Sequence, residues 1–194
     1  MSGVLPAIVA LCWALLVPAF AMLPILPVLA DEELDRRTTI GIKLFRTTLA
    51  ADTAIAEKAG EGGALSLLLF YAHDRERAEV LAERLRAAGA IRRTPIRVAL
   101  SDDPSLAAFD DHPPVAVFLS EEPDDGEDLA RLVDYAEEHG SLLFSPFRGH
   151  VERGVGAGLF IAAKVRPYLN LRSLEASGIA LRPFFLRIAK TVDE

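Results

Sequence analysis

Two short apolar runs with no polar face constrain the fold of this chain more than any other feature. LSLLLFYA (65–72) and PVAVFLS (114–120) are typical of strands that are buried on both sides of a sheet. Amphipathic stretches of helical period precede, separate and follow them, at 38–58, 73–89 and 121–140. Strands that alternate with helices form right-handed crossover units. The sequence therefore predicts an α/β fold, in which a largely parallel sheet carries helices on both faces.

The spacing of apolar residues also predicts which side chains enter the core. In the first helix Ile42, Phe45 and Leu49 share one face. In the second helix the residues predicted to be buried are Val80, Leu81 and Leu85. Further strands are predicted at 95–100 and 141–144, and a short capped helix at 101–111.

The last 50 residues have a different pattern. Residues 159–170 are consistent with one strand or with a hairpin. Asn170 is placed to cap a short helix that Gly178 closes, and Pro183 is placed to open a final helix. In that last helix we expect Phe184, Phe185 and Ile188 to face the core and the arginines to face outward. No repeat or linker divides residues 31–194, so one compact domain is expected.

The first 30 residues carry no charge, whereas all 21 basic and 28 acidic side chains follow Ala30. Residues 4–30 are apolar, and Val28 and Ala30 fit the −3 and −1 positions of a cleavage site before Asp31. Residues 1–30 therefore read as a secretory signal peptide. An uncleaved anchor is the alternative, because the run is long enough to span a bilayer. Either form places the domain in an extracytoplasmic space, and after cleavage no membrane span is expected.

Residue types that usually carry catalysis or bind metals are scarce after the leader. The only cysteine, Cys12, lies within the leader, which excludes disulfides and thiol chemistry in residues 31–194. The four histidines have no metal-ligand spacing. The acidic run EEPDDGED (121–128) lacks the order of an EF-hand loop and fits a helix start. We therefore expect no enzyme activity, no cofactor and no metal, with a hydrolase of unfamiliar geometry as the remaining catalytic alternative.

Charge is distributed unevenly along the chain. Residues 101–145 hold 13 acidic groups and 1 basic group, whereas 146–194 hold 8 basic and 4 acidic groups. Such blocks either form a solvated surface or guide association with an anion, a protein partner or a second copy. The net charge of −7 and the leader disfavour nucleic acid. Within the basic flank, we expect the binding positions to be Arg153, Arg166, Asn170 and Arg187.

The carboxyl-terminal stretch resembles the ending of the YfiR family. Members of that family close with a pattern similar to R-F-E-I-N, a short helix, a glycine and S-S-x-L-L-x-L-A. Here RPYLN (166–170), LRSLEASG (171–178) and PFFLRIA (183–189) stand at these elements. The leader, the first helix and the strands of the LLLFY and VAVFLS kind follow the family's order, so the resemblance extends over residues 38–190.

This resemblance implies a YfiR-like α/β periplasmic domain over 31–194, which in many members is a homodimer. It implies a non-enzymatic regulator that binds the periplasmic part of an inner-membrane signalling protein, typically a diguanylate cyclase, and restrains it. The alternative from the residues is a periplasmic module that binds a small anion or another solute at the carboxyl ends of the parallel strands.

Overall fold

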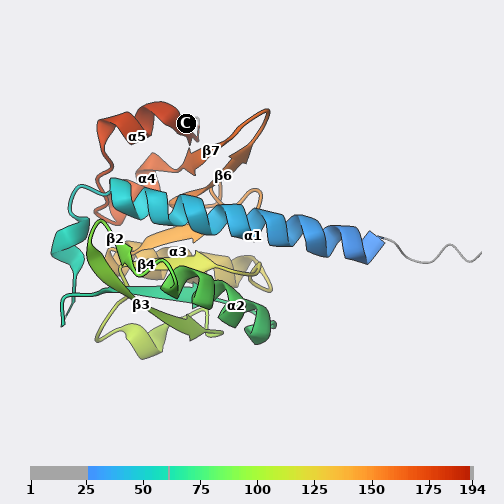
Figure 1. The fold of residues 1–194 in the computed structure, drawn as a ribbon, viewed down its shortest axis with the longest axis horizontal. Helices are drawn as coiled ribbons and strands as arrows, with labels where there is room; N and C mark the ends of the chain where they lie inside the picture. Colours follow the sequence, from blue (N-terminus) through green and yellow to red (C-terminus); the bar gives the residue numbers. More distant parts are fainter. Residues whose placement is uncertain (1–25, 61, 193–194) are drawn as a thin grey trace, which may run out of the picture.

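The computed structural model describes residues 26–60 and 62–192, which form one α/β domain around a mixed eight-stranded sheet (Figure 1). The strand order is β2-β3-β1-β4-β5-β6-β7-β8. Strands β3, β1, β4, β5 and β6 are parallel to their neighbours in this series, whereas β2 and β7 pair antiparallel with β3 and β6. The strands are β1 (Leu65–Phe70), β2 (Ala90–Ile91), β3 (Thr94–Ser101), β4 (Ala116–Leu119), β5 (Leu142–Ser145), β6 (Ala157–Ile161), β7 (Val165–Leu169) and β8 (Lys190–Thr191).

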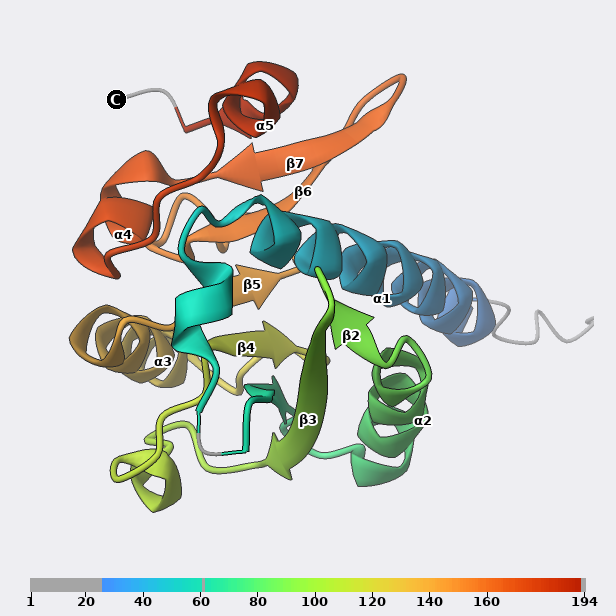
Figure 2. The same cartoon turned by 60° about the vertical axis from the view of Figure 1, so that its left-hand side comes forward.

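Helices cover both faces of this sheet, as the sequence predicts (Figure 2). Side chains of α1 and α2 share one core cluster, and those of α3 share the other. The helices are α1 (Leu26–Ala51), α2 (Arg75–Arg86), α3 (Gly126–His139), α4 (Leu171–Ala176) and α5 (Pro183–Ile188), with short 3-10 helices η1 (Ile55–Lys58) and η2 (Ala107–Phe109).

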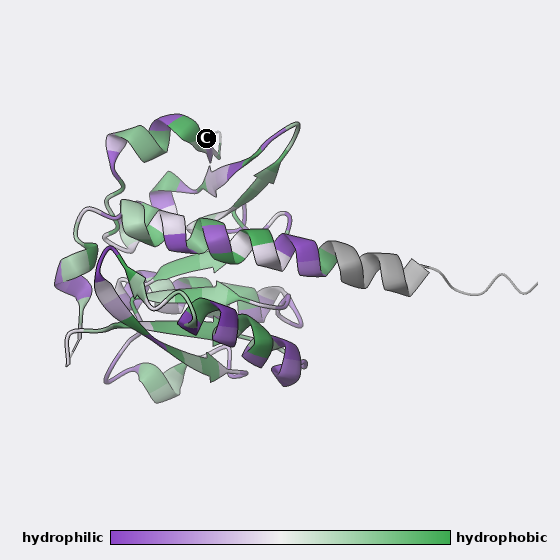
Figure 3. Ribbon diagram, viewed as in Figure 1, coloured by the Kyte–Doolittle hydropathy of each residue, from purple (hydrophilic) through white to green (hydrophobic). Residues whose placement is uncertain are grey.

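Alternation along the central strands divides the core into two layers. In β1, Leu67 and Leu69 face α1 and α2, whereas Leu68 and Phe70 face α3. Because both faces are covered, the central strands β1 and β4 are almost entirely apolar, and in Figure 3 the central strands are largely green between helices striped in green and purple. The spacing thus fixes which residues of each strand meet which helical layer.

The first helix packs on the sheet through an aromatic cluster. Phe45 of α1 lies 5.5 Å from Phe118 and 5.7 Å from Phe144, measured between ring centroids. Gly41 allows this close approach, because a Cβ atom there would lie 3.1 Å from Pro146 and 3.3 Å from the Phe118 ring. The predicted burial of Ile42, Phe45 and Leu49 is therefore confirmed.

Several predicted elements differ from those observed. Val80 of α2 is 49% exposed, so its predicted burial is wrong, while Leu81 and Leu85 are buried as predicted. The helix expected at 101–111 shortens to η2, because the side chain of Asp103 binds Ser105 and closes a local turn instead. The two-residue strand β2 was not predicted. Residues 159–170 contribute to a hairpin of β6 and β7 rather than to a single strand.

Residues 1–25 of the predicted leader lie outside the described residues. Helix α1 begins at Leu26, so the predicted cleavage position between Ala30 and Asp31 falls within this helix. Among the helices of the described part, none is both long enough and apolar enough to cross a membrane.

Candidate functional site

The carboxyl ends of the parallel strands are the first place to look for a site, because open α/β sheets bind ligands there. Strands β1, β4 and β5 end at Phe70, Leu119 and Ser145. The loops that follow them meet at one edge of the sheet. A polar group in these loops can bind a solute only if it is not already hydrogen-bonded within the protein.

Glu121, two residues beyond β4, fills the most favourable anion position at this edge. Its Oε2 accepts hydrogen bonds from the backbone N–H groups of Ala72, His73 and Asp74, at 2.8, 2.7 and 3.0 Å. These donors lie just before α2, where backbone N–H groups attract negative charge. Burial alone would raise the pKa of Glu121, but the three hydrogen bonds outweigh burial and lower it. The chain therefore supplies its own carboxylate to an anion site.

Charged partners extend this cluster outward. The Nε2 of His73 lies 2.8 Å from Oδ1 of Asp124, and both side chains are more than half exposed. Asp74 caps α2 by accepting a hydrogen bond from the Arg77 N–H. The carboxylate of Glu121 is thus the inner member of a mixed-charge surface.

The loop after β5 is fixed by groups from α1 and from the loop itself. The buried guanidinium of Arg37 donates to the Pro146 carbonyl through Nε and Nη2, at 3.1 and 2.6 Å. The Oγ of Ser145 lies 2.8 Å from the Nδ1 of His150 and accepts a hydrogen bond from the Phe147 N–H. A bond from the Ser145 hydroxyl to Nδ1 satisfies all these groups when His150 is neutral.

The Ser145–His150 pair resembles a nucleophile and its base, but both residues are buried. Burial and then the Arg153 charge lower the pKa of His150 to about 4, although Glu152 opposes them. A neutral, enclosed imidazole next to an enclosed hydroxyl holds the loop in place and has no surface for a substrate.

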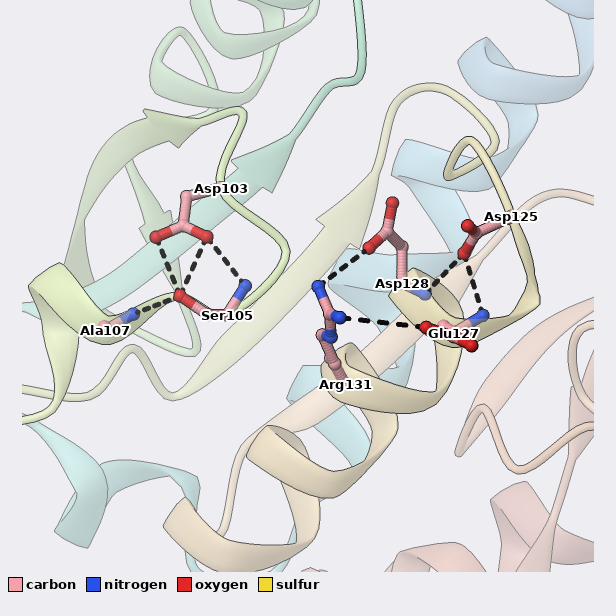
Figure 4. Close-up of polar contacts among 7 residues, drawn as sticks. All are labelled: Asp103, Ser105, Ala107, Asp125, Glu127, Asp128 and Arg131. Atoms are coloured by element: carbon pink, nitrogen blue, oxygen red, sulfur yellow. Dashed lines mark hydrogen bonds and ion pairs between the residues drawn. The ribbon is translucent and has the colours of Figure 1, made fainter.

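The acidic run after β4 starts a helix, as predicted (Figure 4). The carboxylate of Asp125 accepts hydrogen bonds from the N–H groups of Glu127 and Asp128, at 2.8 and 2.9 Å. Arg131 pairs with the side chains of Glu127 and Asp128 one turn later. Over residues 26–60 and 62–192, no three His, Cys, Asp or Glu residues are grouped so as to hold a metal ion.

The four predicted binding residues lie on different segments of the carboxyl-terminal part. Arg153 lies beside the start of α3, since a Cβ atom on Gly126 would be 3.2 Å from its Nη2. Arg166 lies over the Phe160 ring on the β6–β7 hairpin, 5.7 Å from its centroid. Asn170 caps α4 through the Ser173 N–H and donates to the Val151 carbonyl, so its side chain is used within the fold. Arg187 lies on α5.

Helix α5 carries the most exposed apolar surface near a predicted binding residue. Phe184 and Ile188 are 54% and 50% exposed, one helical turn apart, and Arg187 is exposed between them in sequence. Only Phe185 of the three predicted core residues is buried, so the prediction for Phe184 and Ile188 is wrong. The reason is that α5 is short and packs at the edge of the sheet beyond β7, where only one side of it meets the core.

Sequence reasoning missed Glu121 and Arg37 as structural parts of the carboxyl edge. Glu121 directly follows the run VAVFLS, and its place at the end of a buried strand was a usable signal. Arg37 had no comparable signal, because its partner is a backbone carbonyl 109 residues away.

Comparisons with known proteins indicate the fold. No protein-family model and no curated protein matches the chain. A solved ABC domain in complex with L-Trp from Streptococcus pneumoniae superposes with a TM-score of 0.53 at 11% identity, over 75% of this chain and 62% of that one. A conserved domain protein from Vibrio cholerae O1 biovar El Tor superposes with a TM-score of 0.51 at 17% identity, over 71% of this chain and 57% of that one. The chain thus covers less than two thirds of either structure, and the likeness shows a shared α/β architecture.

Proposed function

We propose that this chain is an exported regulatory protein without catalytic activity, which binds the periplasmic part of a membrane signalling protein through α5. The observation that carries the proposal is the surface formed by Phe184, Ile188 and Arg187. Phenylalanine and arginine are enriched at protein interfaces, and covering a large apolar side chain releases about 1.5–3 kcal/mol.

The position of this surface in the chain agrees with the proposal. Helix α5 coincides with the PFFLRIA segment, one of the elements that carry the resemblance to the YfiR regulators. The carboxyl edge supports the same function, since Glu121 occupies its N–H donors and Arg37 and His150 fix the loop after β5. Because these groups are bonded within the fold, we expect the partner protein to be recognised by exposed side chains. The proposed partner is a diguanylate cyclase, with a sensor kinase as the alternative.

A complementation experiment tests this function. Cells that lack the gene are supplied with the wild-type chain, with Phe184→Asp, or with the control Leu171→Asp. Leu171 is a matched control because it is 48% exposed and lies on α4. We expect deletion to change the cyclic-di-GMP level, wild type and Leu171→Asp to restore it, and Phe184→Asp to fail.

The partner is identified in the same strains by crosslinking the tagged chain and purifying it from solubilised membranes. A signalling protein should be recovered with wild type and with Leu171→Asp, and at least about tenfold less with Phe184→Asp, because an interface centre is where such changes cost most. Unchanged cyclic-di-GMP and kinase output after deletion, with no recovered membrane protein, would contradict the proposal.

A second candidate is a solute-binding module, which the fold of the L-Trp-bound ABC domain favours. In that case Arg153, which lies beside the start of α3, is the predicted binding residue that we expect to contact the solute. A thermal-shift screen of the chain with L-Trp, other amino acids and small anions tests it. A ligand that raises the melting temperature of wild type and not of Arg153→Ala would support this function, and no shift with any compound would count against it.

A further inference from the structure

Strand β3 has a long outer edge that the domain leaves open. It runs from Thr94 to Ser101, and its outer neighbour β2 pairs only with Thr94 and Pro95. The Ser101 carbonyl accepts from the Tyr71 N–H, so residues 97, 99 and 101 direct their backbone groups toward the β1 side. The backbone groups of Ile96, Val98 and Leu100 therefore point outward. In the described part of the chain, no strand pairs with this outer side over 96–101.

Two contacts cover this edge in part. The Ile96 N–H donates to the Gly89 carbonyl at 3.2 Å, and Nη2 of Arg86 donates to the Val98 carbonyl at 3.0 Å. Arg86 is itself held by Glu79 and Glu83 on α2. The Arg86 side chain satisfies only the Val98 carbonyl, whereas a second strand would also pair with the outward groups of Val98 and Leu100 that these two contacts leave open.

The two ends of the open edge carry opposite charge. Arg92 and Arg93 form the turn that enters β3, and Asp102 and Asp103 follow its last residue. All four side chains are exposed. Residues 84–97 include five arginines and no acid, so the entry end is basic over a wider surface as well.

The basic turn is held in a backbone conformation that arginine disfavours. Arg92 and Arg93 have φ values of 49° and 79°, in the left-handed region. A two-residue hairpin turn with both φ values positive favours Asn-Gly, because glycine has no Cβ and asparagine tolerates the left-handed region, whereas most other side chains are strained there. Residues in strained conformations are often found at functional sites. Here the strained turn places two guanidinium groups beside an open strand edge.

We propose that two copies of this chain associate through β3, edge to edge and antiparallel about a two-fold axis at Ala99. Strand β2 and the Gly89 carbonyl occupy the outer side up to Ile96, so the second strand covers 97–101 and Val98 faces Leu100 of the second copy. Antiparallel pairing brings the basic end of each edge to the acidic end of the other. The interface is isologous and closes the sheet edge of both copies. It goes beyond the proposed function, which uses α5 near the opposite edge of the sheet.

Disulfide trapping tests this register in the full chain in detergent micelles. Cys12 is the only cysteine, so Cys12→Ser gives a cysteine-free background. Ala99 would face its own copy in a non-hydrogen-bonded pair, with Cα atoms about 4.5 Å apart, within the range that a disulfide spans. With mild oxidation we expect Ala99→Cys to form a covalent dimer several-fold faster than the control Ala176→Cys, an exposed position on α4. Equal rates for the two variants, or no covalent dimer, would overturn the proposal.

A charge exchange tests the electrostatic part of the same interface by sedimentation. Arg93→Asp and Asp102→Arg each place like charges together, and we expect each to weaken the dimer about fivefold or more. The double variant restores opposite charges and should recover wild-type association. The control Arg172→Asp on α4 should leave association unchanged.

Two outcomes of the sedimentation experiment contradict the proposal. A wild-type chain that stays monomeric at all concentrations rules out the dimer. A dimer that neither single reversal weakens, or that the double variant does not restore, uses a different surface. Circular dichroism of each variant verifies that the fold is retained.

Discussion

The Oγ of Ser145 lies 2.8 Å from the Nδ1 of His150, and both side chains are enclosed at the end of β5. His150 is only 4% exposed, and burial lowers its pKa from 6.5 to about 4. This relationship ties the loop that carries Arg153 and Glu152 to the end of the buried strand β5. It also makes the stability of that loop depend on pH.

The first prediction concerns the free energy of unfolding at acidic pH. Because the folded pKa of His150 lies below the unfolded value, the unfolded chain binds more protons between about pH 6.5 and 4. The contribution of the neutral imidazole is present above this window and falls as the pH falls through it. We expect the free energy of unfolding to be about 2 kcal/mol lower near pH 5 than near pH 7. Urea unfolding measures it, and His150→Asn should remove most of this difference; an equally steep dependence in the variant would contradict the assignment.

The second prediction concerns the carboxylate of Glu121. Glu121→Ala leaves three backbone N–H groups without their acceptor and should lower the free energy of unfolding by about 2 kcal/mol. Added sulfate should raise the melting temperature of this variant and have little effect on wild type, because the anion replaces the lost carboxylate. Glu122→Ala, at the exposed neighbouring position, is the control.

The lowered pKa of Glu121 adds a pH dependence of its own. The carboxylate stabilises the fold fully above about pH 4.5, and its contribution is lost as the pH falls further through the folded pKa. Glu121→Ala should therefore show a shallower loss of stability below that pH than wild type. Sulfate rescue without this change in slope would argue against the charged form as the stabilising one.

The third prediction concerns Gly158 of β6. A Cβ atom there would lie 2.6 Å from the Ser145 carbonyl oxygen and 2.7 Å from Val151 Cγ2. Since the carbonyl belongs to a paired strand and cannot move aside, Gly158→Ala should cost about 3 kcal/mol. Gly60→Ala is the matched control, because the nearest atom to its Cβ is 4.0 Å away. Chemical denaturation compares the two, and similar midpoints would show that β6 can shift.

The fourth prediction concerns Tyr135, whose buried hydroxyl has no hydrogen-bond partner among the residues that the structure describes. Burial first, and then the charge of Asp110, raise its pKa to about 12. Removing an unsatisfied hydroxyl costs no hydrogen bond, so Tyr135→Phe should leave stability unchanged or raise it by up to about 1 kcal/mol. The stacked contact with His139, 4.1 Å between ring centroids, is kept in the variant. A clear loss in melting temperature would reveal a partner for the hydroxyl.

The fifth prediction concerns the strained turn. Replacing Arg92 by Asn and Arg93 by Gly matches the residues to the positive φ values and should stabilise a dilute chain by about 1–2 kcal/mol. Urea unfolding at low protein concentration measures it. If the turn also serves the β3 interface, the same double variant becomes more stable and associates less, a combination that a purely structural turn would not produce.

Helices and strands were largely predictable because their signals are local. The buried runs at β1 and β4, the cap Asn170, the helix start at the acidic run 121–128 and Pro183 at the start of α5 are all found where the sequence places them. Each depends on periodicity or on the hydrogen bonds of a helix end, which involve residues within one or two turns of each other.

The site was less predictable because its contacts join distant parts of the chain. Arg153, Arg166 and Arg187 share a charge, yet they are carried by the turn before β6, by β7 and by α5. Glu121 and the N–H groups before α2 meet only because β1 and β4 are neighbours in the sheet. Phe184 has the same helical spacing as a core residue, and its exposure follows from the position of α5 beyond β7.

The sequence by itself determined the α/β class, the uncharged first 30 residues, the lack of cysteine after them and the alternation that sorts each central strand between two helical layers. These follow from composition and from the periods of helix and strand, which act over a few residues. Tertiary structure alone decided the strand order, the enclosed Ser145–His150 pair, the carboxylate in the α2 anion position and the open edge of β3. These features depend on which strands pair with one another and on which groups remain exposed after pairing. Both are properties of the whole sheet.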